Sequence, residues 1–165
     1  MKNQADRKIA ENFLAAYAAH DFERIKQLLH SGIEWSLPGD GKISGVATGI
    51  EAVIERVKTI IGSGIRTELH DILIGQNGIT LSLHNSAKKP DGRVLEEQLA
   101  TVLTIDSGLI RRIDTYISDV PMMERFLTNS PDEPSAHGSS PAPRPIVRIG
   151  QQRTSHSVAD AASGR

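Results

Sequence analysis

Apolar residues recur at helical spacing in three segments of the first half of the chain. The segments are residues 5–19, 22–29 and 50–61. In each of them the apolar side chains return every three or four positions, which places them on one face of a helix. Asp21 is suited to cap the second helix, and Thr48 with Glu51 matches the capping-box pattern at the start of the third. The sequence therefore predicts three amphipathic helices.

From residue 66 onward, the pattern changes to the two-residue alternation that is typical of β-strands. The expected strands are residues 66–74, 79–86, 93–105 and 109–118. The sequences Asn-Gly, Pro-Asp-Gly and Asp-Ser-Gly separate them, and all three are typical of hairpin turns. Short connections pair consecutive strands antiparallel. Together with the helices, this meander predicts an α+β domain whose helices pack on one face of the sheet.

A further strand is expected just before the third helix. Ile33, Trp35 and Leu37 alternate with polar residues, and Pro38 ends the pattern because it cannot donate to a strand ladder. A glycine-rich loop follows. Trp35 is the only tryptophan of the chain, and a large aromatic side chain on a short strand beside a flexible loop indicates the wall of a core or of a cavity.

Composition divides the chain at about residue 128. Residues 1–128 carry the periodic segments, whereas residues 129–165 are rich in Ser, Pro, Ala and Gly and predict a disordered tail. The net charge of −1 gives no support for nucleic-acid or membrane-surface partners. Cysteine is absent, which excludes disulfides and thiolate chemistry. No apolar stretch is long enough to span a bilayer, so a cytoplasmic location is expected.

Several short motifs occur in an order that is familiar from one superfamily. They are Tyr17–Asp21, Trp35–Gly39, Ser44–Val53, Pro90–Arg93, Asp106–Ile110 and Tyr116–Asp119. Over about residues 5–128 the chain resembles the nuclear transport factor 2-like superfamily, in the branch of SnoaL-like polyketide cyclases and ketosteroid isomerases. The resemblance implies a cone-shaped, curved antiparallel sheet wrapped around three N-terminal helices. It also implies a mostly apolar cavity and a homodimer that forms through the sheet.

The resemblance also suggests which residues meet a ligand. Tyr17, Trp35 and Leu37 are expected to line the cavity. When the chain is set against the isomerase landmarks, Phe13 occupies the position of the family's tyrosine and Leu37 that of its catalytic base. Neither side chain can take the role of the group it replaces, so the steroid isomerase mechanism is disfavoured.

Asp119 and His84 are the predicted catalytic pair. Asp119 matches the acidic residue that the cyclase branch carries near the end of its last strand, and a carboxyl group buried in an apolar cone is suited to proton transfer. His84 can act as an acid or base near neutral pH. Each residue has a commoner role, since Asp119 also fits the cap of a helix over residues 120–127 and His84 also fits an ordinary sheet histidine.

Arg112, Asp114 and Tyr116 share one face of the last expected strand. The arginine–aspartate pattern is similar to that of the epoxide-hydrolase branch, in which such a pair helps to activate water. In this interpretation Asp114 is the base, Arg112 orients it, and Asp114 and Tyr116 belong to the substrate pocket. A solvated ion pair is the commoner role of such neighbours.

Neither a metal nor a cofactor is predicted, because histidines do not occur at metal-ligand spacing and the loop Gly39–Lys42 lacks the phosphate-binding pattern. The sequence thus predicts a pocket protein for a small hydrophobic molecule. One interpretation is an acid–base enzyme of cyclase or isomerase type that acts on a hydrophobic carbonyl or polycyclic compound. The alternatives are a non-catalytic ligand-binding or dimerisation module and, more weakly, an epoxide hydrolase.

Overall fold

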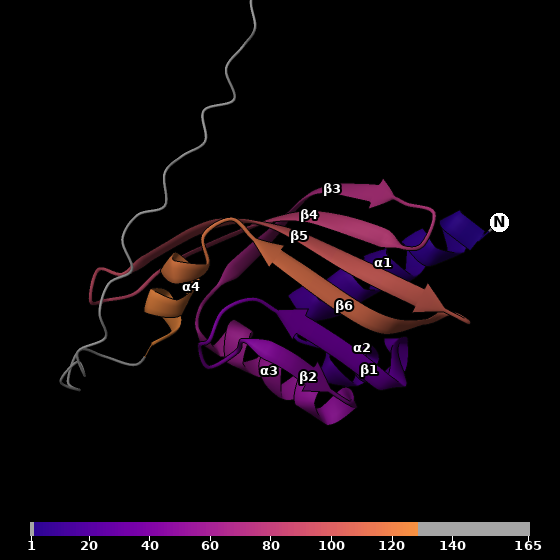
Figure 1. The fold of residues 1–165 in the computed structure, drawn as a ribbon, viewed down its shortest axis with the longest axis horizontal. Coiled ribbons are helices and arrows are strands. Elements are labelled where there is room, and N and C mark those ends of the chain that lie inside the picture. Colours follow the sequence, from indigo (N-terminus) through magenta and orange to yellow (C-terminus); the bar gives the residue numbers. More distant parts are fainter. Residues whose placement is uncertain (1, 129–165) are drawn as a thin grey trace, which may run out of the picture. The chain divides into compact units, whose positions relative to one another are not determined.

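The computed structural model describes residues 2–128 of the chain. Helices and strands follow one another in the order that the periodicity predicts, with one additional short strand (Figure 1). The helices are α1 (Lys2–Ala18), α2 (Phe22–Leu28), α3 (Ile50–Gly62) and α4 (Val120–Leu127). The strands are β1 (Leu29–Leu37), β2 (Gly45–Thr48), β3 (Arg66–Ile74), β4 (Ile79–Lys88), β5 (Val94–Asp106) and β6 (Leu109–Ile117). The predicted tail, residues 129–165, lies outside the described residues.

The six strands form one curved sheet in the order β2-β1-β6-β5-β4-β3. The meander from β3 to β6 is antiparallel, as expected. The pair β1–β6 is parallel, with Trp35 opposite Ile113, so the sheet is mixed rather than purely antiparallel. Turn sequences predict only pairs of consecutive strands. A parallel pair joins strands that are distant in the sequence, so the turns gave no sign of it.

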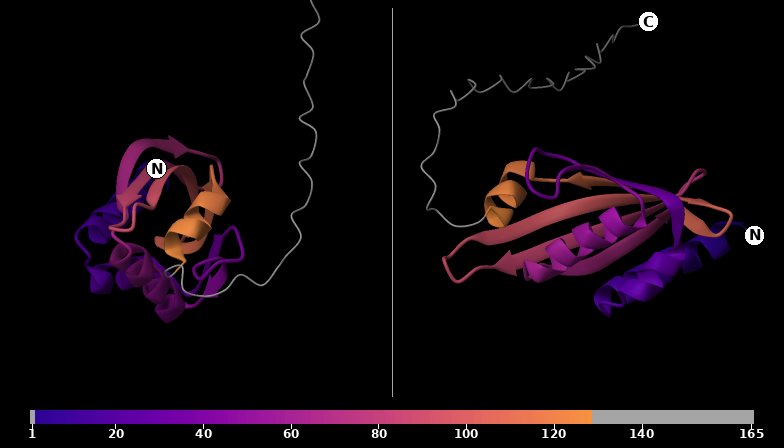
Figure 2. Two further views of the ribbon diagram at one scale, coloured as in Figure 1. Left: turned by 90° about the vertical axis from the view of Figure 1, so that its left-hand side faces the viewer. Right: turned by 90° about the horizontal axis from the view of Figure 1, so that it is seen from below.

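Helices α1, α2 and α3 lie along one side of the curved sheet, and α4 lies at one end of it (Figures 1 and 2). The apolar faces of α1, α2 and α3 join the inward-facing residues of the strands in one hydrophobic core. The α+β cone-like architecture predicted from the sequence is therefore confirmed. None of the described helices has both the length and the apolar character that a membrane crossing requires.

The helix caps agree only in part with those predicted from the sequence. The Asp21 carboxylate accepts a hydrogen bond from the backbone N–H of Arg24 at 2.9 Å, as expected for the start of α2. The predicted capping box of α3 is wrong, because the N-cap residue is Gly49 and no side chain caps the helix. Thr48 instead ends β2, where it pairs with Glu34 of β1.

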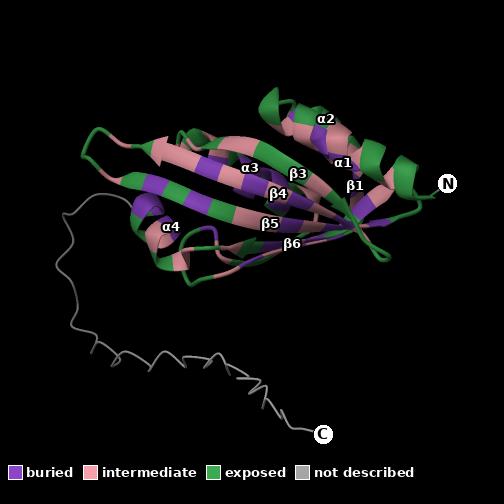
Figure 3. Cartoon of the chain, turned by 90° about the horizontal axis from the view of Figure 1, so that it is seen from above, coloured by how far each residue is buried: buried purple, intermediate pink, exposed green. Residues whose placement is uncertain are grey.

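Burial alternates along the central strands, so the sheet has an inner and an outer face. Along β5 the inner positions are buried, except for half-buried Leu99, and the residues between them are exposed or half-buried (Figure 3). The inner face of β4 similarly carries Leu81, Leu83 and Asn85, whereas His84 faces outward. This alternation decides which polar side chains of the sheet can reach the core.

Candidate functional site

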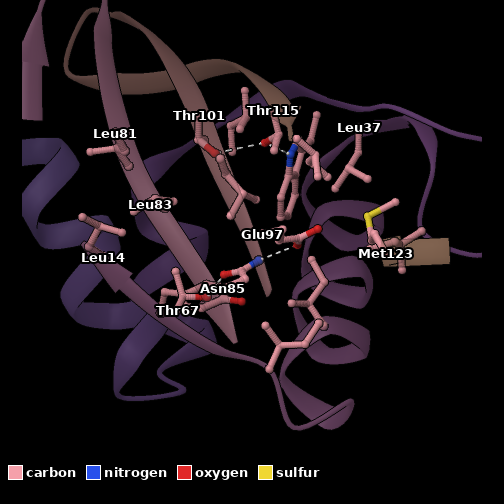
Figure 4. Close-up of a pocket in the computed structure, with 18 of the residues that line it drawn as sticks. Leu14, Leu37, Thr67, Leu81, Leu83, Asn85, Glu97, Thr101, Thr115 and Met123 are labelled. Atoms are coloured by element: carbon pink, nitrogen blue, oxygen red, sulfur yellow. Dashed lines mark hydrogen bonds between the residues drawn. The ribbon is translucent and has the colours of Figure 1, made fainter. Parts of the chain in front are cut away.

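A cavity opens between the inner face of the sheet and the helices. Residues from α1, α3, α4 and all strands except β2 line it, together with residues of two loops (Figure 4). Most of the lining side chains are apolar, such as Leu14 of α1, Leu83 of β4 and Met123 of α4. The cavity has a volume of about 70 Å³, whereas pockets for drug-sized ligands usually have several hundred Å³. The cavity therefore suits a small apolar compound.

Glu97 of β5 is the acidic residue of the cavity wall. It is only 2% exposed, although glutamate is almost never fully buried without a partner. Asn85 donates a hydrogen bond from Nδ2 to Oε1 of Glu97 at 3.0 Å. The other carboxyl oxygen, Oε2, is buried and has no hydrogen-bond partner among the residues that the structure describes. Glu97 thus presents an unsatisfied oxygen in a cavity whose wall is mostly apolar.

The environment of Glu97 favours the protonated acid. Burial raises the pKa of Glu97, the hydrogen bond from Asn85 lowers it, and the charge of Asp119 raises it. The net direction is upward from the ordinary value. A carboxyl group of this kind exchanges protons closer to neutral pH than an exposed glutamate does.

A short polar chain extends from Glu97 toward α1. Thr67 of β3 donates from its hydroxyl group to the side-chain oxygen of Asn85 at 2.7 Å, and Asn85 in turn donates to Glu97 (Figure 4). Tyr17 of α1 lines the same cavity. Burial raises the pKa of Tyr17, and the side chain of Thr67 lowers it by a smaller amount. Tyr17 therefore remains a protonated hydroxyl donor over the physiological pH range.

A second polar group lies at Trp35 of β1. Its indole nitrogen Nε1 donates to the hydroxyl oxygen of Thr115 at 3.0 Å, and this hydroxyl lies 3.2 Å from that of Thr101. Arg56 of α3 stacks over the Trp35 ring at 5.4 Å and donates to the backbone oxygens of Trp35 and Gly45. These contacts fix the indole against the cavity.

The structure brings three of the predicted pocket residues together. Tyr17, Trp35 and Leu37 all line the cavity, and Phe13 does so as well. Phe13 and Leu37, which were aligned with the tyrosine and the catalytic base of the isomerases, therefore present apolar side chains to the cavity. Contact between these residues and a ligand stays a prediction.

Asp119 does not line the cavity, which corrects its predicted place in a catalytic pair. It is the N-cap of α4, and its carboxylate accepts a hydrogen bond from the backbone N–H of Met122 at 2.9 Å. The capping role that the sequence also allowed is thus the one observed. Asp119 still affects the site, because its charge contributes to the raised pKa of Glu97.

His84 lies on the outer face of the sheet, where it cannot reach a ligand in the cavity. Its ring nitrogen Nε2 is 2.7 Å from a carboxylate oxygen of Glu96, and its ring stacks on that of His70. The alternation of β4 explains the position, because Leu83 and Asn85, the two neighbours of His84, face inward. The predicted pairing of His84 with Asp119 in the cavity is therefore wrong.

Asp114 and Tyr116 also lie on the outer face, which corrects their prediction as pocket residues. Arg112 donates to both carboxylate oxygens of Asp114 at 3.0 and 2.9 Å and forms an ion pair with Glu34 at 3.1 Å. Tyr116 is 63% exposed. Their neighbours Ile113, Thr115 and Ile117 point into the cavity. A water molecule activated by the Arg112–Asp114 pair would therefore lie outside the cavity.

Sequence analysis missed the acidic residue that does face the cavity. The signal was the alternation of β5, in which Leu95, Glu97, Leu99 and Thr101 occupy every second position. Because alternate residues of a strand share one face, Glu97 had to face inward with the leucines on either side of it. The same argument identifies Asn85 next to His84.

Comparison with known proteins gives the family. The model of the SnoaL-like domain matches residues 10–113. The uncharacterized protein Rv0034 of Mycobacterium tuberculosis is 24% identical over 129 residues, which cover 76% of this chain and 98% of that protein.

Two solved structures have the same fold. Bal32a, from a soil-derived mobile gene cassette, has a TM-score of 0.73 at 18% identity, with 78% of this chain and 100% of that chain covered. TerC, co-crystallized with polyporic acid, has a TM-score of 0.64 at 17% identity, with 74% and 98% covered. At these identities the structures show the fold alone. The family match spans more than half of the chain and agrees with the curved sheet and its inner cavity, and the chain belongs to the SnoaL-like domain family.

Proposed function

We propose that this protein binds a small hydrophobic carbonyl compound in its cavity and that Glu97 acts on the compound as an acid–base group. The position of the Glu97 carboxyl group carries the proposal. The group is buried, borders an apolar cavity and keeps one oxygen without a hydrogen-bond partner among the described residues. A buried polar atom without a partner is costly. A ligand that supplies a partner to Oε2 would remove this cost.

The proposed reaction is proton transfer beside a carbonyl group. The ionised Glu97 takes a proton from the carbon next to the carbonyl, and the electron pair of the C–H bond moves to form the enolate. The acid form of Glu97 then returns the proton to the same or to a conjugated carbon. The hydroxyl group of Tyr17 is the proposed hydrogen-bond donor to the carbonyl oxygen, because burial keeps it protonated.

The size of the cavity narrows the substrate class. At about 70 Å³ it has roughly half the volume of a cavity that holds benzene, about 150 Å³, so it suits a short-chain compound better than a cyclic or polycyclic one. TerC, which has the same fold, was co-crystallized with polyporic acid. That observation supports the general idea that a protein of this fold takes a small organic ligand.

Deuterium exchange tests the proposal directly. The full chain is incubated with butanone in D₂O near neutral pD, and NMR follows loss of the signal from the protons next to the carbonyl. We expect exchange faster than in buffer alone and expect Glu97→Gln to abolish the increase. Glu96→Gln is the matched control, because Glu96 is the next residue of β5 and its side chain lies on the outer face. This control should exchange at the wild-type rate.

Each outcome separates the proposal from its rival. Equal exchange by wild type and Glu97→Gln refutes the catalytic role of Glu97. Saturable binding of the ketone without any exchange favours the non-catalytic binding module. Absence of both binding and exchange refutes this substrate class.

A homodimer and a cytoplasmic location also remain predictions. The outer sheet face exposes Tyr116 and Val94, at 63% and 50%, and is thus available for contact with a second copy. Sedimentation equilibrium of the full chain would test the dimer, since a monomer mass over the whole concentration range contradicts it.

A further inference from the structure

Three potential metal ligands meet on the outer face of the sheet, away from the cavity. Glu68 and His70 come from β3, and His84 comes from β4. One ligand atom from each of the three lies within 4.8 Å of the other two. Glu96 of β5 adjoins them through its contact with His84. None of the four lines the cavity, so this cluster is independent of the function proposed above.

The register of the strands produces the cluster. Glu68 lies directly opposite His84 in the antiparallel β3–β4 pair, where side chains on one face are neighbours. A β-bulge between Leu69 and Asp71 leaves His70 as an extra residue of β3. Bulges commonly re-aim a side chain. Here the imidazole of His70 stacks against that of His84, with ring centroids 5.7 Å apart.

Charge on this face favours a cation. Two carboxylates, of Glu68 and Glu96, flank the two imidazoles. Arg66, at 2.8 Å from the carboxylate of Glu68, is the cation that competes for it. A carboxylate oxygen of Glu96 contacts Nε2 of His84, and carboxylates often bind the second ring nitrogen of a metal-binding histidine in this way.

We propose that Glu68, His70 and His84 form a binding site for a divalent first-row transition-metal ion such as Zn²⁺, with Glu96 as the neighbouring carboxylate that orients His84. Imidazole ligands favour Zn²⁺, Ni²⁺ or Cu²⁺ over Mg²⁺ and Ca²⁺. Ligand atoms around a tetrahedral zinc ion lie about 3.3 Å apart, from bond lengths of about 2.0–2.1 Å. Glu68 and His70 are exposed, so small rotations of their side chains can close the remaining gap.

Zinc binding to the full chain is measured by competition with a chromophoric chelator. We expect one ion per chain at this site and expect His70→Ala and His84→Ala each to weaken binding about tenfold or more. Glu96→Gln should weaken it less than either. His20→Asn is the matched control, because His20 is an exposed histidine outside the cluster and asparagine tolerates its φ of 55°. It should bind zinc as the wild type does.

A second measurement needs no variant. NMR of the histidine ring nitrogens during a zinc titration should shift the signals of His70 and His84 before those of the other four histidines. Failure to bind zinc overturns the proposal. So does unchanged affinity in the His70→Ala/His84→Ala double variant, or a first shift at any other histidine. An excess of Mg²⁺ that displaces the zinc would overturn the assignment to a transition metal.

Discussion

Replacing Glu97 by glutamine should make the protein more stable at neutral and alkaline pH. Glu97 is 2% exposed, and burial is the largest cause of the raised pKa of its carboxyl group. Glutamine has nearly the same shape as the protonated acid, and it keeps an oxygen that can accept the hydrogen bond from Asn85. The substitution therefore removes the ionisation of the buried group while leaving its packing nearly intact.

The pH dependence follows from proton linkage. Because the pKa of Glu97 is higher in the folded than in the unfolded state, the folded chain binds more protons between the two values. The free energy of unfolding of the wild type therefore falls as the pH rises from about 4.3, the ordinary glutamate value, through the folded pKa. In total, the free energy of unfolding falls by about 1.4 kcal/mol for each unit that separates the folded from the unfolded pKa. Above the folded pKa the loss is complete.

Urea unfolding of wild type and Glu97→Gln at a series of pH values between 4 and 8.5 measures this effect. Other titrating groups occur in both proteins, so subtracting one curve from the other cancels their contributions. We expect similar stabilities near pH 4 and a growing advantage of Glu97→Gln toward a plateau. A difference that is independent of pH, or a variant that is less stable at pH 8, would refute the argument that ionised Glu97 is destabilised by burial.

Substitutions at three further positions test other parts of the site. Asp119→Asn should keep the cap of α4, because asparagine is also a good N-cap, and should reduce the pH-dependent loss of stability that is due to Glu97. Asp119→Ala should lower the free energy of unfolding in urea by about 1 kcal/mol. Trp35→Phe should lower the free energy of unfolding by about 1–3 kcal/mol, since it removes the buried hydrogen bond to Thr115; an unchanged midpoint would contradict this. Arg56→Met should cost about 2 kcal/mol, because it leaves the buried backbone oxygen of Trp35 and the part-buried one of Gly45 without their donor. A loss below 0.5 kcal/mol would show that water replaces the guanidinium group.

Periodicity was sufficient to predict most elements of the fold, because each amphipathic helix and each alternating strand carries its own pattern. It missed β2, a strand of four residues with mostly exposed side chains, and thus without an alternating burial pattern. It also misassigned Thr48, because the cap pattern is local whereas the pairing of Thr48 with Glu34 depends on the tertiary arrangement. Local patterns therefore predict elements better than they predict competition between them.

The apolar wall of the cavity was easier to predict than its chemistry. Tyr17, Trp35 and Leu37 were expected in the wall, and they line it. His84 was chosen because an imidazole titrates near neutral pH, although its own strand places it on the face opposite Leu83. Glu97 attracts no attention by residue type alone, since an exposed glutamate is common. Its burial, which raises its pKa, depends on how distant parts of the chain pack together.

Glu96 and Glu97 show that position rather than residue type assigns chemistry in this sheet. The two carboxylates are adjacent in the sequence, yet one is exposed beside His84 and the other is buried beside Asn85. A slip of one residue in the register of β5 would exchange them. The leucines at positions 95, 99 and 103 prevent the slip, because it would turn their side chains to the outer face. The register that fixes the core therefore also separates the cavity from the proposed metal site. Glu97→Gln should then alter ketone exchange without affecting zinc affinity, and His84→Ala should do the reverse.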